Sequence, residues 1–229
     1  MERHFYIIAT PIGNLDDMTY RAVNVLKDVD TILCEDTRVT QRLLDHYTIA
    51  TPTQSYHAQS SKHKENTIIQ RIASGTTFAL VSDAGTPTIS DPGVKLIARI
   101  RSELPEVTLI PIPGASALVT ALCTTGFSGN QFTFYGFLPH KKGRSKIFDT
   151  IEVAEHVAVF YESPHRLMKT LAELSKRLGG DRTIGVAREL TKIYEEIVIN
   201  TAENVHQYFL DNPDHVRGEF VILVNTTSS

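Results

Sequence analysis

The sequence predicts an α/β protein with two domains, the first built on a mainly parallel sheet and the second on a mixed sheet. Three observations support this prediction. Short β-rich runs alternate with helix-length segments in the first half of the chain. After Gly126 the strands become more frequent and the helices fewer. A turn-rich stretch, Thr124–Asn130, separates the two patterns, and 229 residues are enough for two small domains.

The first half begins with a predicted strand, Phe5–Ala9, followed by an amphipathic helix, Tyr20–Val29, whose apolar residues recur at helical spacing. The same strand–helix order then repeats. The predicted pairs are Thr31–Cys34 with Val39–Tyr47, Phe78–Val81 with Val94–Leu104, and Val107–Ile112 with Ala115–Cys123. Strands that alternate with helices pair in parallel, so this half predicts a parallel α/β layer.

The second half contains more strand and less helix, which favours a mixed sheet. Its predicted strands are Phe132–Phe137, Val157–Tyr161, Ile184–Ala187, Glu195–Ile199 and Phe220–Val224. We place the domain boundary within the turn-rich stretch and predict domains at residues 1–124 and 125–229.

The composition excludes several classes of protein. Hydrophobic residues make up 41% and charged residues 21% of the chain, and the net charge is -3, which excludes a disordered tail and a strongly basic nucleic-acid binder. The apolar runs are far shorter than the roughly 18 residues that span a bilayer, and the chain opens on a strand-like segment instead of a leader. Cys34 and Cys123 have no CxxC or CxxH neighbours. We therefore expect a soluble, cytoplasmic protein without a membrane segment or disulfide.

Four loops that follow predicted strands are candidates for ligand binding, because open α/β sheets bind ligands at the carboxyl ends of their strands. They are Thr10–Leu15, Glu35–Arg38, Ser82–Gly93 and Pro113–Ala117. Glycines in such loops let the backbone approach a ligand closely. A purely structural interpretation is also open: Asp91 can cap a helix that starts at Pro92, and Gly114 can simply ease a sharp turn.

The absence of several motifs reduces the number of possible ligand classes. The sequence contains neither GxGxxG nor a glycine followed by lysine, which disfavours a dinucleotide-binding dehydrogenase and a P-loop enzyme. HExxH is also absent, and the nine histidines include no helical pair at metal spacing. No metal is predicted.

The loops together resemble those of the tetrapyrrole methylase superfamily. The motifs that carry the resemblance occur in order over about residues 5 to 224: TPIGNL, CEDTR, LVSDAGTPTISDPG, PIPGASA, YGFLPHKKGR, FYESPHR, ARELTK and RGEFVILV. They are most similar to the bacterial branch that methylates a cytidine ribose 2′-hydroxyl in small-subunit (16S) ribosomal RNA. The resemblance implies two α/β domains with S-adenosylmethionine bound in a cleft between them, and it suggests a homodimer.

The resemblance also implies which residues bind the cofactor. They match the superfamily's first proline, its backbone-binding stretch with the hydrophobic contact after it, and its small pair after Pro-Gly: Pro11, Ala84, Gly85, Thr86, Ile89, Ser116 and Ala117. In the second half, Glu162 and Leu190 stand where tetrapyrrole-binding members have Met and Gly. A carboxylate therefore replaces an apolar cofactor contact at residue 162.

Three carboxylates are candidates to orient or deprotonate the acceptor hydroxyl, in the order Asp36, Glu162 and Glu35. Each can instead be a helix cap or an ion-pair partner of Arg38 or Arg166. For RNA phosphates, the sequence offers the basic run His140–Lys146 and the start of a helix at SPHR, and the alternatives there are a solvated loop and an ordinary helix start. The RNA-binding candidates are Arg38, Lys141, Lys142, Arg144, His165 and Arg166.

The leading hypothesis is therefore a methyltransferase that acts on ribosomal RNA or on the small ribosomal subunit. Two alternatives stay open at this point. A methyltransferase for a tetrapyrrole-like small molecule would have an apolar acceptor cleft and would not need Lys141, Lys142 or Arg144. A non-catalytic RNA-binding protein of ribosome assembly would retain the fold without turnover.

Overall fold

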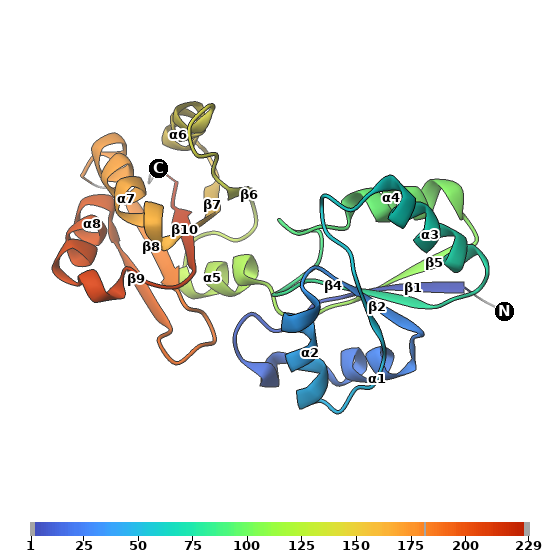
Figure 1. Cartoon of the computed structure of the whole chain (residues 1–229). Helices are drawn as coiled ribbons and strands as arrows, with labels where there is room; N and C mark the ends of the chain where they lie inside the picture. The colour runs from blue at the N-terminus through green and yellow to red at the C-terminus, as the bar shows by residue number, and fades with distance from the viewer. Residues whose placement is uncertain (1–2, 181, 227–229) are drawn as a thin grey trace. The chain divides into compact units, whose positions relative to one another are not determined.

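The computed structural model describes residues 3–180 and 182–226, so the outermost residues of both predicted domains lie outside the described part. The chain divides into two compact units, a first unit of Met1–Ser116 and a second unit of Ala117–Ser229 (Figure 1). Each unit contains its own five-stranded sheet. We describe each unit by itself.

The first unit is a parallel sheet covered by helices on both faces. Its strands have the order β3-β2-β4-β1-β5, and every pair is parallel. The strands are β1 (Arg3–Ile8), β2 (Thr31–Cys34), β3 (Thr53–Ser55), β4 (Phe78–Val81) and β5 (Val107–Ile112). The helices are α1 (Tyr20–Asp28), α2 (Thr37–His46), α3 (Lys62–Ala73) and α4 (Val94–Glu103).

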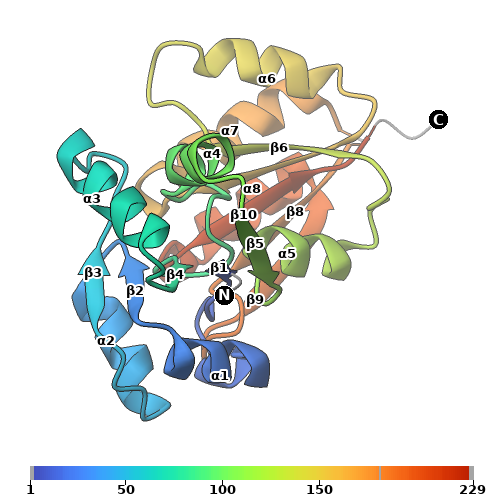
Figure 2. The same ribbon diagram turned by 90° about the vertical axis from the view of Figure 1, so that its right-hand side faces the viewer.

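Side-chain alternation along the strands creates two separate cores in this unit. On β4, Ala79 and Val81 belong to the core under α1 and α2, whereas Phe78 and Leu80 belong to the core under α3 and α4. Both views show α1 and α2 on the side of the sheet away from α3 and α4 (Figure 1 and Figure 2). A sheet buried on both faces presents its loops, not its faces, to ligands.

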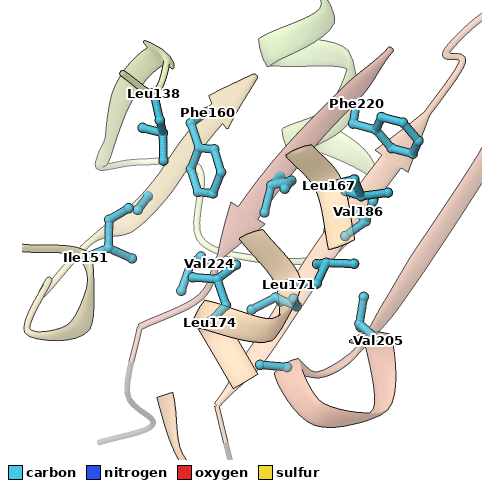
Figure 3. Close-up of a cluster of buried hydrophobic side chains, with 14 of the residues drawn as sticks. Leu138, Ile151, Phe160, Leu167, Leu171, Leu174, Val186, Val205, Phe220 and Val224 are labelled. Carbon is cyan, nitrogen blue, oxygen red and sulfur yellow. The ribbon is translucent and has the colours of Figure 1, made fainter. Parts of the chain in front are cut away.

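The second unit has a mixed sheet of order β6-β7-β10-β8-β9, in which only β6 and β7 are parallel. The strands are β6 (Phe132–Phe137), β7 (Val157–Glu162), β8 (Thr183–Arg188), β9 (Glu196–Thr201) and β10 (Phe220–Val224). The helices are α5 (Ala117–Thr125), α6 (Arg144–Glu152), α7 (Pro164–Leu178) and α8 (Ala202–Asp211). Side chains such as Phe160, Val186, Leu171 and Val205 fill the core between sheet and helices (Figure 3).

The fold class that the sequence predicts is confirmed: a parallel sheet comes first and a mixed sheet second. The division of the chain falls earlier than the predicted 124/125, between Ser116 and Ala117. The reason is α5, which we assigned to the first domain as the partner of β5. Its inward residues, among them Leu118 and Leu122, are buried in the second unit, and Thr125 lies against Gly185 of β8.

Helix α4 begins at the predicted residue, and this excludes the alternative in which Asp91 caps a helix that starts at Pro92. It begins at Val94 after Gly93, which has φ +129°, so Asp91 does not cap it and Pro92 does not start it. A Cβ at Gly93 would lie 2.7 Å from a methyl carbon of Leu80, so this turn requires glycine both for its conformation and for its space. Within residues 3–180 and 182–226, no helix is long and apolar enough to cross a membrane.

Candidate active site

Three of the predicted cofactor-binding loops are joined to one another at the carboxyl end of the first sheet. Thr10 and Gly85 exchange two backbone hydrogen bonds, Thr10 N to Gly85 O at 2.9 Å and Gly85 N to Thr10 O at 3.0 Å. The Ser82 hydroxyl donates to Gly85 O at 2.6 Å, and the Thr86 hydroxyl donates to Ala115 O at 3.1 Å. Segments that follow β1, β4 and β5 therefore form one cross-linked surface.

This surface leaves backbone donors available. Within the described residues, neither Ala84 N–H nor Thr86 N–H donates a hydrogen bond, and Ala84 is exposed. Gly85 has φ +82°, and a Cβ there would meet Ile12 at 3.3 Å. Free amides on a glycine turn can hold a carboxylate or hydroxyl ligand directly on the backbone. The geometry thus fits a cofactor with polar ends.

The other predicted cofactor residues lie in different settings. Pro11 is buried next to Thr10, Ile89 is 39% exposed, and Ser116 is half-buried at the end of the first unit. Ala117 is the first residue of α5, and Leu190 is buried in the loop after β8, both in the second unit. No observation tests their role in binding, so these assignments stay predictions.

Asp36 follows β2 and caps α2. Its Oδ1 accepts the backbone N–H of Arg38 at 2.8 Å, and its two oxygens accept the Arg38 Nε and Nη2 at 3.1 and 2.7 Å. The hydrogen bonds from the Arg38 side chain, and then from its backbone, lower the pKa of Asp36 to about 2. The ion-pair alternative from the sequence therefore describes Asp36 as the structure shows it, and a carboxylate so stabilised is a weak proton acceptor.

Glu35, next to Asp36, is exposed, and no hydrogen bond or ion pair of its side chain occurs among the described residues. Its charge acts on Asp91, a residue that the sequence reasoning treated only as a helix cap. Burial, and then the negative charges of Glu35 and Asp83, raise the pKa of Asp91 to about 6. Asp83 also accepts the Asp36 backbone N–H at 3.1 Å. The loops after β2 and β4 thus share an acidic neighbourhood that spacing alone does not reveal.

Glu162, the last residue of β7, lies in a buried charged cluster in the second unit. Its side chain is 0% exposed, and Arg144 Nη2 and Arg166 Nε lie 2.9 and 2.8 Å from its two oxygens. The Thr170 hydroxyl donates to Oε2 at 2.7 Å, and Ser163 N–H donates to Oε1 at 2.9 Å. Arg166 Nε is close enough for an ion pair but is not aligned as a hydrogen-bond donor.

The RNA-binding candidates therefore divide into exposed and inward-facing groups. Arg144 and Arg166 point at Glu162, with side chains 12% and 17% exposed. Lys141, Lys142 and His165 are exposed, and so is Arg38 despite its pair with Asp36. Thr170 is a member of the cluster that sequence reasoning missed, although it lies four residues after Arg166 and so on the same face of α7. Among the described residues, no group of His, Cys, Asp or Glu could hold a metal ion.

Comparison with known proteins adds three findings. The family model for tetrapyrrole (corrin/porphyrin) methylases matches residues 4–206. A ribosomal RNA small subunit methyltransferase I from Pasteurella multocida is 42% identical over 220 residues, which cover 96% of this chain and 78% of that protein. A solved structure of diphthine synthase superposes with a TM-score of 0.72 over 98% of this chain and 90% of its own, at 12% identity.

A further solved structure carries information on ligands. Uroporphyrin-III C-methyl transferase from Thermus thermophilus, complexed with S-adenyl homocysteine, has a TM-score of 0.64 at 15% identity and covers 97% of each chain. At this identity the likeness shows a shared fold.

Proposed function

The chain belongs to the tetrapyrrole (corrin/porphyrin) methylase family, and on this premise we propose that it methylates a cytidine ribose 2′-hydroxyl of small-subunit ribosomal RNA with S-adenosylmethionine. The resemblance read from the sequence is confirmed by the family match and by relatives such as the Pasteurella multocida enzyme. The name of that relative supports ribosomal RNA as the substrate class. The cytidine and the ribose oxygen come from the motif resemblance alone.

The observation that carries the cofactor part is the joined surface of Thr10, Gly85, Thr86 and Ala115, with its unused Ala84 and Thr86 amides. When bound, S-adenosylmethionine supplies a methyl group on a positively charged sulfur. The residues of this surface bind and orient it, because in-line displacement depends chiefly on the alignment of acceptor oxygen, methyl and sulfur. The structure of the Thermus thermophilus relative with S-adenyl homocysteine is consistent with this cofactor.

For the acceptor proton, we propose a different order of the candidates. Both Asp36 oxygens already accept from Arg38, and both Glu162 oxygens have donors. Glu35 has an exposed carboxylate without a partner among the described residues. We therefore propose Glu35 as the group that accepts the hydroxyl proton, and Asp36 as a cap that fixes the start of α2 beside it.

The RNA backbone would be held by exposed cations. Lys141 and Lys142 are exposed in the loop of residues 138–143 between β6 and α6, which we call the basic loop, and His165 is exposed on α7.

We further propose that the protein forms a homodimer and that it is located in the cytoplasm. Sedimentation of the purified chain tests the homodimer.

A direct test is methyl transfer to small ribosomal subunits and to naked ribosomal RNA from cells that lack the gene. The chain is incubated with S-adenosylmethionine carrying a labelled methyl group, and ribose methylation is mapped by resistance of the adjacent phosphodiester to alkali. The proposal requires label on one cytidine ribose. Label on a base, or on a tetrapyrrole offered in parallel and not on RNA, would overturn the substrate assignment. Cofactor binding without any transfer would favour the non-catalytic alternative.

A further inference from the structure

The cluster around Glu162 ties three separate segments together. Glu162 ends β7, Arg144 begins α6, and Arg166 and Thr170 lie in the first two turns of α7. Arg144 Nη2 also donates to Thr170 Oγ1 at 2.6 Å. Because each carboxylate oxygen has two close partners, the carboxylate is occupied by the protein's own donors.

Both arginines also donate hydrogen bonds to backbone carbonyls at the start of the basic loop. Arg166 Nη1 donates to Leu138 O at 2.7 Å, and Arg144 Nη1 donates to Pro139 O at 3.4 Å. Leu138 is 1% exposed, and its side chain lies in the hydrophobic core beside Phe160 (Figure 3). The loop is therefore fixed at Leu138 by both its side chain and its carbonyl, three residues before the exposed Lys141.

From this geometry we infer that Glu162 is a positioning residue: its buried carboxylate holds Arg144 and Arg166 against the basic loop, and so sets where Lys141 and Lys142 meet RNA phosphates. The RNA part of this inference rests on the proposed function, whereas the positioning of the loop does not. The cluster has one negative and two positive charges, so it leaves a net positive charge at the start of the basic loop. The electrostatic field of this positive charge favours the binding of a phosphate at the loop.

This role differs from the base role that the sequence also allows for Glu162. A general base must be free to reach the acceptor proton, and removing it lowers the rate with bound RNA while leaving affinity unchanged. A positioning residue shows the opposite split. Its removal weakens RNA binding and mobilises the loop, and the rate at saturating RNA stays close to that of the wild type.

The test is Glu162→Gln, which keeps the shape and removes the charge. Trypsin cleaves after lysine, so limited proteolysis with mass spectrometry reports opening of the loop at Lys141 and Lys142 directly. We expect cleavage there about tenfold faster than in the wild type, since local opening exposes the backbone. We expect RNA affinity to fall about tenfold, although the variant has one negative charge fewer at the cluster, because Lys141 and Lys142 are no longer held in place. The saturated single-turnover rate should stay within about threefold.

Two further variants make the result decisive. Asp214→Asn removes one partner of an exposed pair with Arg217 in the same unit, and it should change neither cleavage nor RNA affinity. Arg144→Lys keeps the charge but has a single terminal nitrogen, so it cannot contact both Glu162 and the Pro139 carbonyl as the two terminal nitrogens of Arg144 do. If Glu162→Gln does not fold, Arg144→Lys carries the test, and it should also raise cleavage at the two lysines.

Unchanged cleavage and unchanged RNA affinity in a folded Glu162→Gln or Arg144→Lys variant would overturn the inference. So would a Glu162→Gln variant that binds RNA as the wild type does but transfers methyl slowly at saturation, because that pattern belongs to a base. Failure of the proposed function is a separate result: the wild type would then neither bind nor methylate RNA, while faster cleavage in the variants would still establish the positioning of the loop.

Discussion

The two units hold their candidate residues by different means. In the first unit, the predicted cofactor loops are joined by hydrogen bonds whose acceptors are backbone carbonyls, as in the paired bonds between Thr10 and Gly85. The Asp36–Arg38 pair there has side chains 29% and 87% exposed. In the second unit, a buried carboxylate, Glu162 of β7, binds side chains from two other segments, α6 and α7. The first arrangement depends on backbone conformation, the second on buried charge.

The position of each carboxylate relative to its strand explains this difference. Asp36 lies two residues beyond the end of β2, where the chain has left the sheet and the side chain can cap the following helix. Glu162 is still within β7, paired in register with Phe220 of β10, and so enters the core. A shift of two residues relative to the strand end therefore decides whether a carboxylate caps a helix near solvent, as Asp36 does, or lies in a buried cluster, as Glu162 does.

The largest effect should come from Glu162→Leu. It leaves two arginines facing each other without their carboxylate, and removal of one partner from a buried charged group costs about 3–5 kcal/mol of unfolding free energy. Asp36→Ala removes an exposed pair and should cost far less. Urea unfolding of both variants measures the contrast. Equal losses would mean that burial does not distinguish the two sites.

Next in size is Gly85→Leu, which tests the backbone side of the comparison. A non-glycine residue at φ +82° costs roughly 1–2 kcal/mol, and its Cβ would press on Ile12 at 3.3 Å. We expect S-adenosylmethionine binding, measured by calorimetry, to be abolished. Gly75→Leu is the matched control. Gly75 also has a positive φ, +100°, with nothing within 4 Å of a Cβ, so this variant carries the same backbone strain outside the predicted cofactor loops. Cofactor affinity that Gly85→Leu leaves intact would remove this loop from the site.

The sequence was sufficient to predict most strands and the parallel and mixed sheets. Several strands, such as Thr31–Cys34 and Phe78–Val81, have the predicted bounds because they are short apolar runs with turns at both ends. Helices α3, α6 and α8 were not among the predicted elements. Helix α6 was obscured because its first residues, Arg144 to Lys146, belong to the basic run that reads as a loop.

The candidate site was predictable only in part, because spacing along the chain does not show burial or long-range partners. The predicted cofactor loops were identified from motifs, and their joining through Thr10 and Gly85 agrees with their placement at one sheet edge. The pairing of Glu162 with Arg144, 18 residues earlier, depends on how β6, α6 and β7 fold together. The neighbourhood of Asp91, Glu35 and Asp83 likewise brings together two loops that are distant in sequence.

Asp91 tests whether buried charge also affects the first unit, because its carboxyl group is partly buried there. Its pKa in the folded protein, about 6, exceeds the unfolded value, so folding favours the protonated form. The stability that the protonated form of Asp91 adds is fully present below about pH 4 and is lost as the pH rises through about 6. Asp91→Asn should therefore match the wild type near pH 4 and be more stable above pH 7, by about 1–2 kcal/mol after allowance for solvent screening.

Urea unfolding at several pH values measures this difference. Glu35→Gln sharpens the test, because removal of a neighbouring negative charge should lower the pKa of Asp91 and move the loss of stability to a lower pH range. An unchanged pH range in Glu35→Gln would mean that the two carboxylates do not interact. A stability difference between Asp91→Asn and the wild type that does not vary with pH would contradict the prediction.

The smallest effect on the fold should come from the exposed lysines. Changing Lys141 and Lys142 together to Ala, while keeping Arg144 for its contact with Glu162, should leave unfolding and cofactor binding unchanged. RNA binding should weaken, and the slope of log affinity against log salt should decrease by somewhat under one unit for each phosphate that the loop no longer neutralises. The control replaces Lys27 and Lys176, which are exposed on α1 and near the end of α7, so it removes the same charge elsewhere. If both double variants reduce affinity and slope equally, the basic loop contributes only net charge. A reduction confined to the Lys141 and Lys142 variant would show that their position matters, which is what the buried cluster at the start of the loop is arranged to fix.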